Sequence, residues 1–203
     1  FIQDGGTLNH QGQLQAYRFT FNGGLISGEP IVTRRLTLNS DGAGDFEFYG
    51  QGNELTGPIA GDQTVMISAG SQPDSPNSYN DAELTWLEGF ENDGVLRLTS
   101  DHEQSSATLE VGEDGDQTLI NRGTIQISGP AEFDYRHQIQ GDLINEGTFN
   151  ASADVRISRA GLIEQMHVTN TGTFTIAPDV RVEAEHFIQD GGTLNHQGQL
   201  QAY

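Results

Sequence analysis

Apolar and polar residues alternate in short stretches along the chain, and most of these stretches contain a glycine followed by a threonine. The clearest copies are LINRGTIQI (119–127), LINEGTFNA (143–151) and VTNTGTFTI (168–176), and FENDGVLRL (90–98) fits with Val95 in place of the threonine. A period of two with one apolar face is the pattern of a β-strand, and a glycine inside it marks a bend or bulge. The pattern therefore predicts repeated strand–bend–strand units.

These units recur through the whole chain. The well-defined copies place their glycine at Gly94, Gly123, Gly147, Gly172 and Gly192, and Gly6 stands in a sequence identical to that around Gly192; degenerate copies place it at Gly24, Gly44 and Gly61. The intervals between Gly6 and Gly192 together span 186 residues. One such unit cannot bury a core by itself, whereas stacked units can. We therefore predict an all-β fold, a parallel β-helix (β-solenoid) with about eight coils in each 186 residues.

One position on the predicted inward face is polar. It lies two residues before the glycine and holds Asn92, Asn121, Asn145, Asn170 and Asp190. Parallel stacking in register places these side chains above one another, so that each can bond the next. Such a ladder satisfies polar groups that would otherwise be costly to bury. By the same alignment Ile188, four residues before Gly192, faces inward.

The first and last seventeen residues of the chain are identical. FIQDGGTLNHQGQLQAY stands at 1–17 and again at 187–203, although the units between them share only a few letters. Residues 1–186 are therefore expected to form one solenoid block, and residues 187–203 the first coil of the next block. The chain is expected to be a length of a longer array. Its predicted partners are adjacent identical blocks, end to end in the same chain or as a homopolymer.

A polar segment interrupts the alternation. SAGSQPDSPNSYNDA (68–82) is rich in residues that form turns, and it predicts a lateral loop inserted between coils. Loops often carry specific contacts. The segment is therefore either a binding loop, for a glycan for example, or an insertion that the scaffold tolerates.

The charge of the chain excludes several classes of partner. It has 29 acidic residues and nine basic residues, which gives a net charge of −20. Binding to nucleic acid and to anionic lipid depends on clusters of Lys and Arg, so neither partner is expected. No apolar stretch approaches the roughly 18 residues of a membrane span. The chain has no cysteine, so disulfides do not contribute to the fold.

The candidate chemistry is sparse. The carboxylates are scattered along the sequence, and no catalytic motif accompanies them, so an enzyme is not expected. Asn39, Asp41 and Asp45 place oxygen ligands at alternate positions among glycines, which weakly indicates a calcium loop. That loop lacks the closing bidentate glutamate. No other cofactor is expected.

The repeated Asn-x-Gly-Thr-apolar pattern resembles the right-handed parallel β-helices of filamentous-haemagglutinin-type and autotransporter adhesins, and of giant bacterial surface proteins. The resemblance covers residues 90–203 well and residues 1–67 loosely. It implies a right-handed solenoid on the outside of a cell. The expected function is a structural segment of a long extracellular fibre, stalk or filament. The alternatives are an adhesin that binds a glycan or host surface through lateral loops and, more remotely, a polysaccharide lyase or hydrolase. The rival fold is a tandem array of β-sandwiches.

Overall fold

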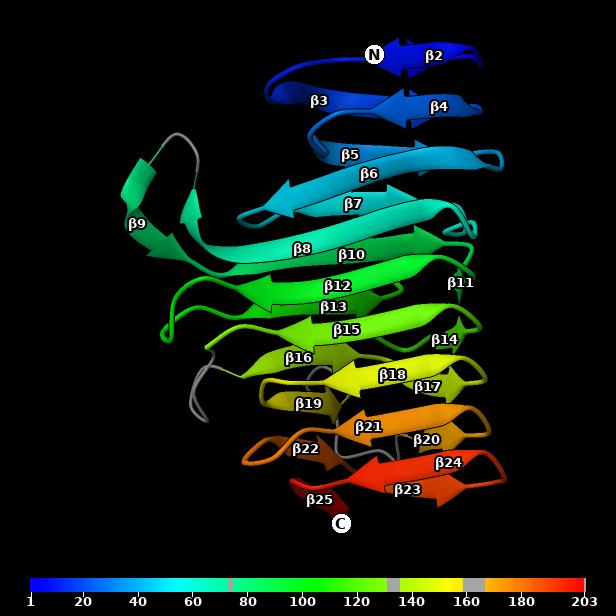
Figure 1. Cartoon of the computed structure of the whole chain (residues 1–203). Helices are drawn as coiled ribbons and strands as arrows, with labels where there is room; N and C mark the ends of the chain where they lie inside the picture. Colours follow the sequence, from blue (N-terminus) through cyan, green and yellow to red (C-terminus); the bar gives the residue numbers. More distant parts are fainter. Residues whose placement is uncertain (73–74, 131–135, 159–166, 203) are drawn as a thin grey trace.

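The computed structural model describes residues 1–72, 75–130, 136–158 and 167–202. Over these residues the chain winds through coils that stack from the N-terminus to the C-terminus (Figure 1). Equivalent strands of successive coils pair in parallel, for example Thr148–Ala151 with Thr173–Ile176. Parallel pairing is the feature that separates a solenoid from an array of β-sandwiches. The predicted all-β solenoid is therefore confirmed.

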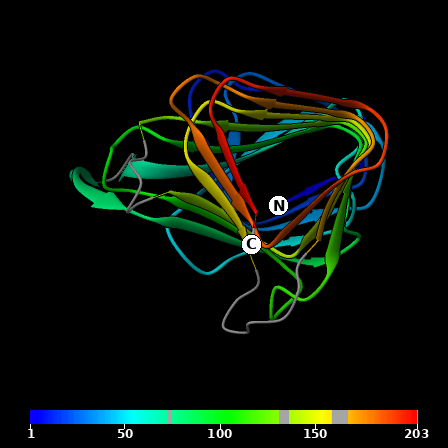
Figure 2. The ribbon, with the colours of Figure 1, turned by 90° about the horizontal axis from the view of Figure 1, so that it is seen from below.

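The strands stack in three columns, which surround one core when the stack is viewed end-on (Figure 2). The first column contains β2 (Thr7–Asn9), β4 (Gly24–Ser27), β6 (Gly42–Tyr49), β8 (Gln63–Gln72), β12 (Val95–Ser100), β15 (Thr124–Ser128), β18 (Thr148–Ala151), β21 (Thr173–Ile176) and β24 (Thr193–His196). The second column contains β3 (Leu14–Phe21), β5 (Ile31–Leu38), β7 (Asn53–Thr56), β10 (Ala82–Glu88), β13 (Ala107–Val111), β16 (His137–Gln140), β19 (Val155–Ser158), β22 (Arg181–Ala184) and β25 (Gln199–Ala202).

The third column changes its construction along the stack. Its separate strands are β1 (Ile2–Gln3), β11 (Glu91–Asn92), β14 (Thr118–Asn121), β17 (Asp142–Asn145), β20 (His167–Asn170) and β23 (His186–Gln189). Near the N-terminus the long strands β3 and β5 run on into this column, because the end of β3 pairs with β1. The column then continues through Ile59, which bridges to Asn92.

The segment 68–82 is more regular than its composition predicts. Residues 68–72 belong to β8, which turns back as β9 (Ser75–Asn80), and the two strands pair in the antiparallel sense. The resulting hairpin projects sideways from the stack (Figure 1). The expected lateral loop is therefore a β-hairpin, whose strands pair through the backbone and so do not depend on an apolar side-chain pattern.

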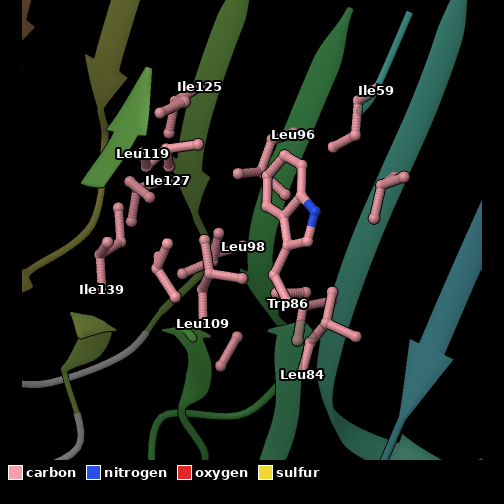
Figure 3. Close-up of a cluster of buried hydrophobic side chains, with 14 of the residues drawn as sticks. Ile59, Leu84, Trp86, Leu96, Leu98, Leu109, Leu119, Ile125, Ile127 and Ile139 are labelled. Atoms are coloured by element: carbon pink, nitrogen blue, oxygen red, sulfur yellow. The ribbon is translucent and has the colours of Figure 1, made fainter. Parts of the chain in front are cut away.

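The core is a continuous column of apolar side chains between the three strand columns. Trp86 lies at its centre with Leu84, Leu96 and Leu98 around it (Figure 3). The Trp86 side chain is fully buried, and its Nε1–H donates to the carbonyl oxygens of Gly57 (3.0 Å) and Glu88 (2.8 Å). The polar atom of this large side chain is thus satisfied inside the core.

Two of the weaker glycine positions differ from the predicted alignment. Gly24 pairs with Gly42 rather than Gly44, and Gly44 pairs with Gln63 rather than Gly61. Each difference is two residues. Side chains alternate with a period of two along a strand, so a shift of two residues leaves every side chain on the same face. The alternation in the sequence therefore fits either register.

Candidate functional site: the amide ladder and the end rung

Four of the predicted asparagines form a ladder inside the third column. Asn92 Nδ2 donates to Asn121 Oδ1 at 2.7 Å, Asn121 Nδ2 to Asn145 Oδ1 at 2.7 Å, and Asn145 Nδ2 to Asn170 Oδ1 at 2.6 Å. All four side chains are fully buried. The bonds all run in the same direction, from the N-terminal coils towards the C-terminal coils.

The second N–H of each ladder amide fixes the corner of the next coil. Asn92 Nδ2 also donates to the carbonyl oxygen of Thr124 (3.2 Å), and Asn121 Nδ2 does the same to Thr148 (3.1 Å). The backbone carbonyl of Asn92 in turn accepts from the N–H groups of Arg122 and Gly123. Each asparagine therefore connects two coils through its side chain and its backbone together, which fixes the register between them.

The ladder ends on Gln189, not on the predicted Asp190. Asn170 pairs with Gln189 in the strand register, and Asn170 Nδ2 donates to Gln189 Oε1 at 3.1 Å. The inward apolar position is likewise Phe187 rather than Ile188, which is 45% exposed. The reason is the corner Gln189-Asp190-Gly191-Gly192, which is one residue longer than the Asn-x-Gly corners. Counting two residues back from Gly192 therefore gives Asp190, one residue after Gln189, which occupies the ladder position.

The other end of the ladder is unsatisfied. Asn92 Oδ1 is buried and lacks a hydrogen-bond partner. The residue that precedes Asn92 in the column is Ile59, whose side chain has no donor. An orphaned buried acceptor costs about 1–3 kcal/mol. The amide ladder therefore has a defined boundary, at which an apolar column replaces it.

The glycines beside the ladder permit a close approach between coils. Gly94, Gly123, Gly147 and Gly172 do not have the positive φ that would itself favour glycine. A Cβ atom on Gly123 would overlap the carbonyl oxygen of Gly94, and one on Gly147 would overlap that of Gly123. A Cβ atom on Gly172 or Gly192 would likewise overlap the backbone of the preceding coil, and Gly192 also has a positive φ. Glycine is retained here because the backbone of the neighbouring coil occupies the space of a side chain.

We call the repeated seventeen residues the end rung; its two copies are residues 1–17 and 187–203. Both copies adopt the same three-strand coil, β1–β2–β3 at one end and β23–β24–β25 at the other. Each copy packs on one side only, so equivalent residues meet different partners. Phe1 stacks on Phe19 with ring centroids 5.1 Å apart, whereas its equivalent Phe187 packs edge-on against Phe174 at 5.2 Å.

The residues proposed as a calcium loop do not converge. Asp41 and Asp45 are exposed, and most of the segment between them belongs to strand β6. At about 3.3 Å per residue, four residues of strand place the Cα atoms of Asp41 and Asp45 about 13 Å apart, whereas ligands of one Ca²⁺ lie about 2.4 Å from the ion. Asn39 instead donates to Asn22 Oδ1 at 2.8 Å. This local geometry does not support the weak calcium site, which stays a prediction for these three residues.

The most buried carboxylates lie in small, separate clusters. Glu47 accepts from the Ser68 hydroxyl at 2.5 Å. Burial, together with hydrogen bonding to Glu47, raises the pKa of Tyr49. Glu183 lies 3.3 Å from the guanidinium of Arg136. In the described parts of the chain no three His, Cys, Asp or Glu side chains gather as a metal site would require. Those parts also contain no helix that could span a membrane.

One buried titratable residue is not predicted by any pattern in the sequence. His137 faces the core of the second column and is fully buried. Its Nδ1 accepts the N–H of Ala107 (3.0 Å), and its Nε2–H donates to the carbonyl oxygen of Ser128 (3.0 Å). Burial lowers the pKa of His137 to about 4, even though the two backbone bonds oppose the shift. A single histidine without a regular spacing cannot be placed in the core by alternation alone.

Comparison of the chain with protein-family models, with curated proteins and with solved structures finds no match. The fold and the candidate site therefore rest on the sequence and geometry of this chain.

Proposed function

We propose that this chain is a structural segment of a long extracellular fibre, stalk or filament on a microbial cell surface, built from 186-residue blocks. The observation that carries the proposal is the end rung, because its two copies pack on opposite sides. Residues 1–17 pair with the coil that follows them, and residues 187–203 pair with the coil that precedes them. One rung can therefore be both the end of one block and the start of the next.

The stacking geometry favours a role in spanning distance. The first column contains eight strands from β2 to β21 before the end rung returns as β24. At about 4.8 Å per strand, each block adds about 38 Å to a fibre. The net charge of −20 on each chain opposes sideways aggregation between neighbouring fibres. The resemblance to adhesin solenoids supports the surface location and the right-handed winding.

Immunogold electron microscopy with an antibody raised against the chain tests this proposal on cells that produce it. The expected result is gold arranged along filaments that project from the cell surface. Gold confined to the cell interior would overturn the proposal.

The β8–β9 hairpin favours a second candidate function, an adhesin that binds glycan. The hairpin projects from a regular stack (Figure 1), and a projection of this kind is accessible to a ligand. A matched control replaces residues 71–79 with Asn-Gly, a two-residue turn that can join the paired residues Gly70 and Asn80. Saturable binding on a glycan array that disappears in this variant would support adhesion. Equal binding by both chains, or no binding by either, would reject it.

A further inference from the structure

We propose that the end rung is a two-sided junction whose partner is a second copy of this block. One side of the rung fits residues 167–186 of the preceding copy, and the other side fits residues 18–38 of its own block. This inference rests on the proposed function for its tandem arrangement, and it adds the contacts that join the blocks.

In residues 187–203 four backbone N–H groups form hydrogen bonds with the preceding coil. The bonds, 2.7–3.0 Å long, run from the N–H groups of Asp190, Thr193, Gln197 and Gln199 to the carbonyl oxygens of Asn170, Gly172, Ile176 and Val180. These are the bonds that Asp4, Thr7, Gln11 and Gln13 of a second copy would make with the same coil, because the residues are identical.

In residues 1–17 a different set of backbone groups forms hydrogen bonds, and these bonds join the rung to the following coil. The carbonyl oxygens of Phe1, Gln3 and Gly6 accept from the following coil, and the N–H groups of Gly5 and His10 donate to it, at 2.8–3.1 Å. The two sets share no atom. Together the copies therefore show both sides of one rung, with each side already paired to the coil that it would meet in a continuous array.

The glutamine of the rung, Gln3 in one copy and Gln189 in the other, lies between a polar and an apolar part of the third column. In both copies its Nε2 donates to the carbonyl oxygen two residues further on, that of Gly5 or Gly191. Its Oε1 is left to accept from the amide ladder, as Gln189 does from Asn170. On the other side Gln3 pairs with Phe21, whose side chain offers no hydrogen bond. This residue therefore ends the polar ladder of one block where the apolar column of the next begins.

A glycine of the rung also fits a neighbour that only one copy has. A Cβ atom on Gly198 would overlap the carbonyl oxygen of Val180, and Gly198 does not have a positive φ. Its equivalent Gly12 has nothing within 4 Å of a Cβ position, and its positive φ of 97° also favours glycine in this copy. Glycine at this position of the rung therefore allows the close approach to residues 177–180 that residues 187–203 show.

A two-block chain, residues 1–186 followed directly by residues 1–203, tests the junction. It contains the full chain and buries one internal copy of the rung. Small-angle X-ray scattering should show one rod whose maximum dimension exceeds that of the single chain by about 38 Å, from eight added rungs at about 4.8 Å. Two compact bodies with a variable separation would overturn the inference.

A matched pair of substitutions in the two-block chain tests the contacts themselves. Gln189→Leu in the internal rung removes the acceptor of Asn170 at the junction, whereas Gln3→Leu in the first rung changes a side chain that has no ladder before it. The internal substitution should lower the midpoint of thermal unfolding by more than the substitution in the first rung, because both lose the bond to the glycine carbonyl and only the internal one removes the acceptor of Asn170. Equal shifts from the two would overturn the inference.

These results separate the junction from the proposed function. A continuous rod in solution without labelled filaments on cells would reject the fibre and leave the junction standing. Labelled filaments on cells, together with a two-block chain that forms two separate bodies, would support the fibre and reject the junction.

Discussion

The two halves of the stack fill the same inward position of the third column with opposite chemistry. In the N-terminal half, after Gln3 of the end rung, this position holds Phe21, Leu38 and Ile59, all buried. In the C-terminal half it holds the four ladder asparagines, which are equally buried. The position is inside the protein in both halves, so burial alone does not select the residue type.

The difference lies in how strongly each half specifies its register. Apolar side chains pack without regard to direction, and a shift of two residues leaves them inside. An amide ladder has a donor and an acceptor on every side chain, so each amide must meet the next one. The N-terminal half has long strands, such as β3 and β5, and extensive pairing between them. From β13 (Ala107–Val111) to the end of the described chain the strands have four or five residues, and the asparagines and glycines hold the register instead.

The largest predicted effect comes from the glycines of the C-terminal half. Gly147→Ala places a Cβ atom against the carbonyl oxygen of Gly123, and neither backbone can move without breaking the ladder. We expect a loss of more than about 3 kcal/mol in the free energy of unfolding, measured by urea denaturation. The control is Gly52→Ala, which has open space and costs only the strain of its positive φ, about 1 kcal/mol. Similar losses from the two would refute the close-approach explanation.

The asparagines should differ according to their place in the ladder. Asn121→Leu leaves Asn92 without its acceptor and Asn145 without its donor, so we expect a loss of about 3 kcal/mol in the free energy of unfolding. Asn92→Leu removes an already orphaned oxygen and moves the ladder boundary by one coil, at a cost of about 1 kcal/mol. Chemical denaturation of both variants measures the difference. If Asn92→Leu proved the costlier, the direction of the ladder would be wrong.

Acid should weaken the C-terminal half through His137. Its folded pKa of about 4 lies below its ordinary value of 6.5, so the unfolded chain binds a proton that the folded chain excludes. Stability from this residue is therefore full above pH 6.5 and falls as the pH drops towards 4. The loss between pH 7 and pH 5 should be about 2 kcal/mol relative to His137→Gln. Parallel stability curves for the two proteins would contradict this assignment.

The smallest effect is expected at the surface of the ladder corners. Arg122 lies between Glu91, Asp93 and Glu146, at 3.1–3.7 Å, but these side chains are exposed. Exposed ion pairs contribute little to stability. Arg122→Ala should therefore leave the denaturation midpoint within the error of the measurement. A loss as large as that of Asn121→Leu would show that the corner is held by charge rather than by the ladder.

The sequence predicts those parts of the fold that repeat with a fixed spacing. The ladder from Asn92 to Asn170 follows from spacing, because each copy stands two residues before a glycine. The prediction of Asp190 as a ladder residue is wrong, because one extra corner residue places Gln189 in the column instead. The prediction that Gly44 aligns with Gly24 is wrong, because alternation cannot distinguish registers that differ by two residues. The β8–β9 hairpin depends on backbone pairing that its polar side chains do not reveal.

Amide hydrogen exchange of the full chain, followed residue by residue by NMR, tests the central claim that the two copies of the end rung are opposite sides of one junction. The N–H groups of Thr193, Gln197 and Gln199 should exchange slowly, and the identical Thr7, Gln11 and Gln13 should exchange quickly. The order should reverse for Gly5 and His10, which should be slow, against Gly191 and His196, which should be fast. Mirror-image protection of two identical sequences is the predicted result, and the same pattern in both copies would contradict the account.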